Sequence, residues 1–155
     1  MPLSKHHIDT KPVATPLDRD RLAALLEAAL PQVVFAYLHG SAAVSGVVPA
    51  HSDLDLALFL DPGTLAADGG TDHSLPDVYV AAAEAAESVA PGVRCDIGIL
   101  NGAEPVFRFE VLKGHLLFCR DREQWLRFYS LTCREYESRL FHYEKQRRYR
   151  LEAGA

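Results

Sequence analysis

Hydrophobic and polar positions along the chain repeat with two periods, which predict helices and strands in alternation. Leucines at helical spacing over Pro16–Leu30 predict a helix, with Asp18 and Asp20 placed where a helix N-terminus favours acidic residues. The alanine-rich run Val78–Ala90 predicts a second helix, which Pro91 and Gly92 end. Four apolar runs of strand length predict strands at Val33–Leu38, Leu54–Leu60, Val93–Leu100 and Leu116–Cys119.

The segments between these elements complete a mixed pattern. Ser41–Val44 and Glu104–Lys113 predict short helices, and Asp121–Arg150 predicts one long or broken helix. Asp61–Asp77 has the Gly, Pro and Asp content of a loop, with room for a short helix. Together these elements predict an α/β or α+β fold, with a small mixed sheet flanked by helices. Residues 16–155 are expected to form a single domain, and residues 1–15 a flexible N-terminus.

Composition places the chain among ordinary globular proteins. Hydrophobic residues make up 48% and charged residues 24% of its 155 positions. No apolar run approaches the roughly 18 residues that span a bilayer, and the polar start does not resemble a signal peptide, so we expect a cytoplasmic protein without membrane contact. Cys95, Cys119 and Cys133 are widely spaced and form no CxxC motif, so we expect reduced thiols rather than metal ligands.

Charge is distributed unevenly along the chain. The net charge is −5, yet Arg120–Arg150 carries nine Lys and Arg against five Asp and Glu, which leaves −9 for the rest. Proteins that bind nucleic acid through bulk charge are basic overall, so direct nucleic-acid binding is not expected. The basic segment is either a solvated helix face or a surface for an anionic ligand or partner. Its aromatic residues favour core packing but are also compatible with docking a partner helix: Trp125, Phe128, Tyr129 and Tyr136.

Two aspartates one residue apart introduce the strand predicted at Leu54–Leu60. Side chains i and i+2 of a strand point to the same face, about 6.6 to 6.8 Å apart at the backbone, so Asp53 and Asp55 project together. Carboxylates beside an apolar core need compensation, and hard oxygen ligands favour Mg²⁺ or Mn²⁺ over Zn²⁺. The alternative is structural: Asp53 caps a turn and Asp55 pairs with an arginine.

Two further features accompany this pair. Gly40 and Ser41 leave the preceding strand and begin a short helix, where backbone N–H groups and the Ser41 hydroxyl can bind phosphate.

Asp96 lies within the apolar strand Val93–Leu100, although aspartate is disfavoured in strands. If the strands are neighbours, three carboxylates converge, as two-metal phosphoryl or nucleotidyl transfer requires. Alternatively, Asp96 pairs with Arg94 or Arg108. His39 and His51 flank the loop and are expected to be structural or exposed.

The order Gly-Ser, a strand carrying "SDLDL", and a third Asp on a later strand resembles the nucleotidyltransferase superfamily of DNA polymerase beta. The chain is similar in length to the minimal nucleotidyltransferase (MNT) domains of that superfamily. The helix ahead of "VVFAYLHGSAA" and the tail "PVFRFEVLKGHLLFCRDREQWLRFYSLTCREYE" look like MntA-type antitoxins, which pair with HEPN-domain toxins.

This resemblance implies a role for each motif residue. Gly40 and Ser41 would hold the phosphates of ATP, and Asp53 and Asp55 would ligate Mg²⁺, with two ions expected. Asp96 would complete the metal site and help to deprotonate the acceptor hydroxyl. Such antitoxins adenylylate a tyrosine of their partner toxin, a metal-dependent RNase, and so neutralise it.

The chain departs from the pattern of the family in two places. The eleven residues 42–52 that separate Gly-Ser from Asp53 are one more than usual, and Val44 stands where the family often has an arginine. Two other functions therefore remain open. One is an antitoxin that acts by binding alone. The other is a small-molecule nucleotidyltransferase of the aminoglycoside-modifying kind, which usually brings a second helical domain for its acceptor.

Overall fold

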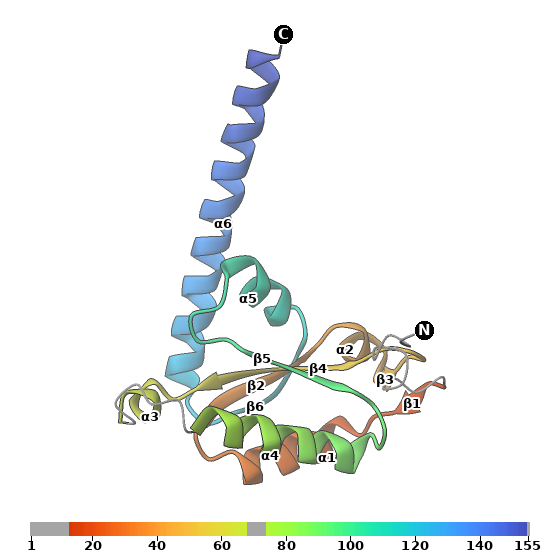
Figure 1. The fold of residues 1–155 in the computed structure, drawn as a ribbon. Coiled ribbons are helices and arrows are strands. Elements are labelled where there is room, and N and C mark those ends of the chain that lie inside the picture. Colours follow the sequence, from red (N-terminus) through yellow and green to blue (C-terminus); the bar gives the residue numbers. More distant parts are fainter. Residues whose placement is uncertain (1–12, 68–73, 155) are drawn as a thin grey trace, which may run out of the picture.

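The computed structural model describes residues 13–67 and 74–154, which form a mixed sheet with helices on both faces (Figure 1). The predicted fold class is confirmed. In chain order the elements are β1 (Thr15–Pro16), α1 (Arg19–Ala29), β2 (Val33–His39), α2 (Ser41–Ser45), β3 (Val47–Val48), β4 (Leu54–Leu60), α3 (Pro62–Ala67), α4 (Ser74–Val89), β5 (Cys95–Ile99), α5 (Pro105–Leu112), β6 (His115–Cys119) and α6 (Arg122–Ala153).

The main sheet has the strand order β5-β4-β2-β6. Strand β2 pairs antiparallel with β4 and with β6, whereas β4 and β5 run parallel. Parallel neighbours need a long crossover, which here includes α3 and α4. The two central strands are buried on both faces, and this explains their nearly continuous apolar sequences.

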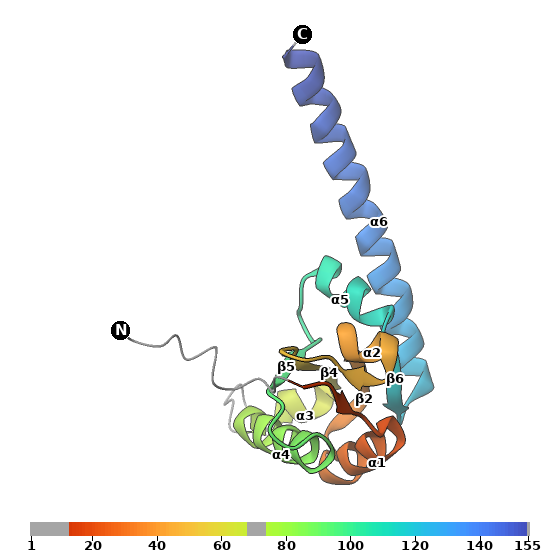
Figure 2. The same ribbon diagram turned by 90° about the vertical axis from the view of Figure 1, so that its right-hand side faces the viewer.

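Alternation along β4 divides the interior into two cores. Leu54, Leu56, Leu58 and Leu60 point into a core that includes residues of α1 and α4. Ala57 and Phe59 point to the opposite face, where they pack with residues of α5 and α6. The views of Figures 1 and 2 place α1 and α4 on one side of the sheet and α5 on the other. Asp55 shares the α5 face, because it alternates with Leu54 and Leu56.

Helix α6 is a continuous helix of 32 residues, so the predicted segment is long rather than broken. Asp121 caps its N-terminus by accepting hydrogen bonds from the backbone N–H groups of Glu123 and Gln124. Its first turns pack on the sheet, where Phe128 is buried and Trp125 donates a hydrogen bond to the Tyr37 hydroxyl at 2.8 Å. At 1.5 Å per residue the helix is about 48 Å long, and its C-terminal part projects beyond the body (Figure 1).

Most element boundaries lie within three residues of the prediction, and the main differences are the start of α4 and two short strands. Helix α4 begins at Ser74, within the stretch predicted as a loop up to Asp77, because Pro76 is tolerated in a first turn whose N–H groups have no intrahelical acceptor. Helix α3 is the short helix for which the loop had room, and residues 68–73 lie outside the described residues. The two-residue strands β1 and β3 were not predicted; Thr15 pairs with Val48, and residues 1–12 are not described. None of the helices in the described ranges combines the length and apolar character needed to cross a bilayer.

Candidate functional site

The Gly-Ser pair lies where β2 ends, as the sequence predicts. Gly40 has φ +70°, a left-handed conformation that favours glycine, and Ser41 begins the five-residue helix α2. A Cβ on Gly40 would lie 2.3 Å from Oδ2 of Asp55, well inside van der Waals contact. Glycine is therefore required at this position for two reasons: its backbone conformation and the close approach of the Asp55 carboxylate.

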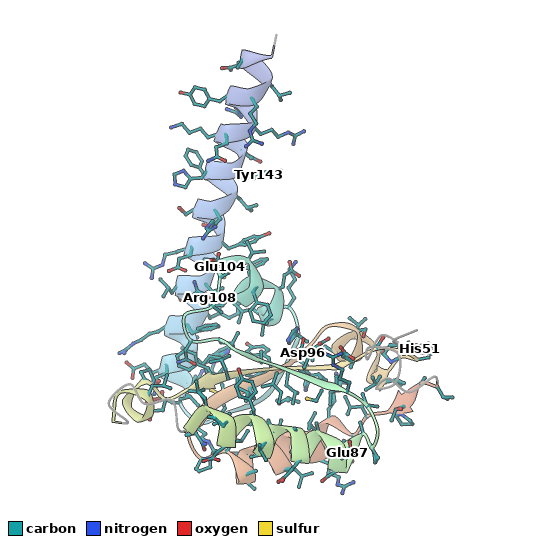
Figure 3. All side chains as sticks on the ribbon, in the orientation of Figure 1. His51, Glu87, Asp96, Glu104, Arg108 and Tyr143 are labelled. Atoms are coloured by element: carbon teal, nitrogen blue, oxygen red, sulfur yellow. The ribbon has the colours of Figure 1, made fainter. Side chains whose placement is uncertain are left out.

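Asp55 and Asp96 are cross-strand neighbours. The parallel register pairs Asp55 with Asp96 and Leu54 with Cys95, and adjacent strands lie about 4.8 Å apart. Both aspartates are on the α5 face, because Leu54 and Cys95 point into the opposite core. Figure 3 shows Asp96 on this side of the sheet. The two strands are therefore neighbours, which is the condition that the sequence analysis set for the carboxylates to converge.

Asp53 directly precedes β4 and is half-buried, as is Asp55, whereas Asp96 is exposed. The alternative ion pair between Asp96 and Arg108 is wrong, because Arg108 pairs with Glu135 of α6. This pair joins α5 to α6.

The electrostatics of the site reflect burial first and neighbouring like charges second. Burial raises the pKa of the Asp55 carboxyl; His39 opposes this shift, and the charges of Asp96 and Asp53 add to it. Burial also raises the pKa of the Cys95 thiol to about 12, with further contributions from the three aspartates. Cys95 is therefore a protonated thiol at neutral pH. A cation bound between the carboxylates would lower the cost of keeping them ionised.

The arrangement fits Mg²⁺ bound together with a nucleotide rather than a cage made by protein alone. Within the described residues, no group of three or more His, Cys, Asp or Glu side chains is arranged to hold a metal ion. Mg²⁺, however, is commonly held by one or two carboxylates together with waters and substrate phosphates. Adjacent hard oxygen donors at Asp55 and Asp96 beside Gly40, the position expected for phosphate, meet that requirement.

His39 is a site residue that the sequence reasoning treated as structural. It pairs with Asp55 in the antiparallel register and packs edge-on against the ring of Phe107 in α5, with 5.7 Å between ring centroids. Burial lowers its pKa, against the opposing effect of Asp55 and Asp96. The two predicted strands on either side of the Gly-Ser loop can pair antiparallel, and in such a pair the end of the first strand lies opposite the start of the second. This reasoning could have placed His39 beside Asp55.

Comparison with protein families assigns the fold to a class. The model of the family described as polymerase beta, nucleotidyltransferase, matches residues 21–123, well over half of the chain. The matched region includes Gly40, Ser41 and all three aspartates. The chain belongs to the polymerase beta nucleotidyltransferase family.

Solved structures share this fold at low sequence identity. A mutant of the toxin-antitoxin MntA-HpeT matches with a TM-score of 0.58 and 19% identity, over 88% of this chain and 97% of that chain. A toxin-antitoxin with AMP-PNP matches with a TM-score of 0.57 and 19% identity, with the same coverage. A tri-AMPylated Shewanella oneidensis HEPN toxin in complex with MNT antitoxin matches with a TM-score of 0.53 and 17% identity, over 86% and 92%. A search of curated proteins found no significant match.

The close approach of Gly40 to Asp55 gives a test with a matched control. Gly40→Ala is expected to abolish detectable Mg-ATP binding, because the new Cβ displaces the Asp55 carboxylate. Gly102 has φ +71° with no heavy atom within 4 Å of an added Cβ, so Gly102→Ala carries only the left-handed strain of about 1 to 2 kcal/mol. Thermal unfolding with and without Mg-ATP measures both effects. Equal loss of Mg-ATP binding in the two variants would contradict a specific role for Gly40.

Proposed function

We propose that this protein is an MNT antitoxin that transfers AMP from Mg-ATP to a tyrosine of a HEPN-domain toxin and so neutralises it. The observation that carries the proposal is the pairing of Asp55 with Asp96 beside Gly40, within a nucleotidyltransferase-family chain. Further support comes from the shared fold with structures that include an AMPylated HEPN toxin in complex with MNT antitoxin.

The chemistry assigns a task to each site residue. Gly40 and Ser41 would bind the phosphates of ATP, and Asp53, Asp55 and Asp96, together with those phosphates, would hold Mg²⁺. When bound, Mg²⁺ neutralises the triphosphate and favours ionisation of the acceptor hydroxyl. Asp96 accepts the phenolic proton as the tyrosine oxygen forms a bond to the α-phosphorus. The bond from that phosphorus to the bridging oxygen breaks, and pyrophosphate leaves with the electron pair.

The exposure of the site favours an acceptor presented by another protein. Asp96 is exposed and Asp53 and Asp55 are only half-buried, so a side chain can approach them from solvent. The acceptor oxygen must come within about 3 to 3.5 Å of the α-phosphorus, in line with the leaving pyrophosphate. A macromolecular partner docked elsewhere on the protein supplies this positioning without an enclosed acceptor pocket.

The projecting part of α6 is the surface that we assign to toxin docking. Leu140, Phe141 and Tyr143 are 47%, 66% and 68% exposed, although large apolar side chains favour burial. Leu140 and Tyr143 also line a cavity of about 570 Å³ together with Val106 of α5. Figure 3 shows Tyr143 on the part of α6 that extends past α5. This groove, hereafter the α5–α6 groove, combines apolar side chains with Arg139, His142 and Gln146 and so suits an amphipathic helix of a partner.

The test is to look for a HEPN-domain protein encoded beside this chain and to co-express the two, followed by intact-mass and peptide mass spectrometry of that partner. We expect mass increments of one AMP each, located on tyrosine. Toxin that is neutralised but unmodified would contradict the enzymatic proposal and support an antitoxin that acts by binding. Transfer of AMP to aminoglycosides but not to the HEPN protein would support the small-molecule transferase.

The docking assignment predicts a loss of affinity without a loss of fold. Leu140→Ser with Tyr143→Ser is expected to weaken toxin binding by about tenfold or more, because buried aromatic and aliphatic anchors dominate interfaces. Tyr79→Ser is the control, since Tyr79 is 40% exposed on α4, across the sheet from the α5–α6 groove. Calorimetry with purified toxin gives the affinities, and Mg-ATP binding should be unchanged in both variants. Unchanged toxin affinity in the double variant would exclude the groove as the docking surface.

A further inference from the structure

We propose that Lys113, in the turn between α5 and β6, binds the β- and γ-phosphates of the nucleotide. The proposal rests on the nucleotidyl-transfer function proposed above and adds a residue that the family motif does not include. Lys113 is 73 positions beyond Gly40 in the chain, so its role becomes visible only in the folded protein.

The fold brings the turn with Lys113 against the Gly-Ser pair. Strand β6 pairs with β2 so that His115 lies opposite Leu38, two residues before Gly40. A Cβ on Gly114 would lie 2.4 Å from the carbonyl oxygen of Leu38 and 3.1 Å from Cα of His39, so the turn presses directly on the end of β2. The position of Lys113 beside Gly40 is therefore fixed by backbone packing.

A cavity of about 390 Å³ lies between these two segments. Within the described chain it is lined by Gly40, Ala43 and Val44 on one side and Glu110, Lys113, Gly114 and His115 on the other. Lys113 carries the one permanent positive charge in this lining, and phosphate oxygens are strong acceptors for an ammonium group. The cavity thus joins Gly40, one of the two predicted phosphate-binding residues, to a cation.

The strand order gives the bound nucleotide a direction. Gly40 directly follows the central strand β2, with Asp55 and Asp96 on the β4–β5 side and Lys113 on the β6 side. The α-phosphate must lie at the carboxylates, where transfer takes place. The remaining phosphates then extend across Gly40 toward Lys113, since β6 and β4 are two strand spacings, or roughly 10 Å, apart.

Lys113 is free to exchange its present partner for phosphate. Its ammonium group lies 3.0 Å from Oε1 of Glu110 and 5.1 Å from the centre of the Phe109 ring, and both charged side chains are 57% exposed. Exposed pairs of this kind contribute little to stability. Glu110 itself lines the cavity and repels phosphate, so it should reduce affinity for the nucleotide.

Binding measurements on the purified full-length chain separate these effects. Lys113→Gln is expected to weaken Mg-ATP and Mg-tripolyphosphate binding by about tenfold or more and to leave AMP binding unchanged, because only the first two ligands reach the cavity. Lys113→Arg should retain most of the affinity, and Glu110→Gln should bind Mg-ATP more tightly than wild type. Lys145→Gln, which removes the same charge from the projecting part of α6, is the control.

The possible results test the role of Lys113 separately from the proposed nucleotidyl transfer. Wild-type protein that transfers AMP, together with Lys113→Gln that binds Mg-ATP as tightly as wild type, overturns the role of Lys113 alone. Equal weakening for ATP and AMP also overturns it, because a contact to the β- and γ-phosphates cannot affect AMP. Wild-type protein that binds neither ATP nor tripolyphosphate overturns both proposals.

Discussion

Replacing Asp53 and Asp55 together with alanine is expected to abolish AMP transfer and to remove the stabilisation that Mg-ATP gives the native protein. A ligand that binds only the folded state raises the free energy of unfolding by RT ln(1 + [L]/Kd), about 2.7 kcal/mol at a hundredfold excess over Kd. Without these two carboxylates Mg²⁺ loses two of its three proposed protein ligands, so this increment should fall to near zero. Thermal unfolding at matched nucleotide concentrations measures it.

The fold of this double variant should survive. Burial and the charges of Asp96 and Asp53 raise the pKa of Asp55, which shows that the folded protein disfavours the ionised form. Removing the two carboxylates relieves that cost, so the melting temperature without nucleotide should stay the same or rise. The variant should also still bind the toxin, because the α5–α6 groove lies outside the changed residues.

A charge-matched control isolates the metal effect. Asp77→Ala with Glu84→Ala removes two negative charges from exposed positions of α4, on the opposite face of the sheet. This control should keep both Mg-ATP binding and AMP transfer. Mg-ATP binding that persists at wild-type strength in Asp53→Ala with Asp55→Ala would show that these aspartates do not hold the metal.

Local sequence determined the parts of the fold that depend on short-range patterns. Strand β4 begins at Leu54 and ends at Leu60, as predicted. A nearly continuous apolar run of this length is typical of a strand that is buried on both faces. Gly40 and Asp55 were recognisable from other local signals: a Gly-Ser step at the start of a short helix can bind phosphate, and a carboxylate beside a core is costly unless it is compensated. Their approach follows from the antiparallel pairing of β2 and β4, which places His39 opposite Asp55.

Long-range pairing was harder to infer. The two-residue strands β1 and β3 exist because Thr15–Pro16 meets Val47–Val48 in the folded chain, and neither segment carries a strand pattern of its own. Lys113 reaches Gly40 only because β6 adds to the free edge of β2. A charged residue in a turn has no local signal that distinguishes a phosphate ligand from a solvated lysine.

Asp96→Asn is expected to reduce AMP transfer by about 10²- to 10⁴-fold, the usual effect of removing a general base, while weakening Mg-ATP binding only a few-fold. Asparagine keeps the size of the side chain but cannot accept the phenolic proton. Binding should suffer less because Asp53 and Asp55 still hold the metal, so the loss falls mainly on the transition state.

Two measurements on the same preparation decide the role of Asp96: single-turnover transfer to the purified toxin, and calorimetric binding of Mg-ATP. Glu84→Gln removes an exposed charge from α4, across the sheet, and should alter neither quantity. A structural role for Asp96 predicts equal losses in binding and transfer together with a lower melting temperature. A catalytic role predicts a large loss of transfer at an unchanged melting temperature, because Asp96 is exposed at its strand position and its side chain supports no core contact. Comparing the loss of AMP transfer with the loss of Mg-ATP binding therefore measures how much more Asp96 stabilises the transition state than the bound nucleotide.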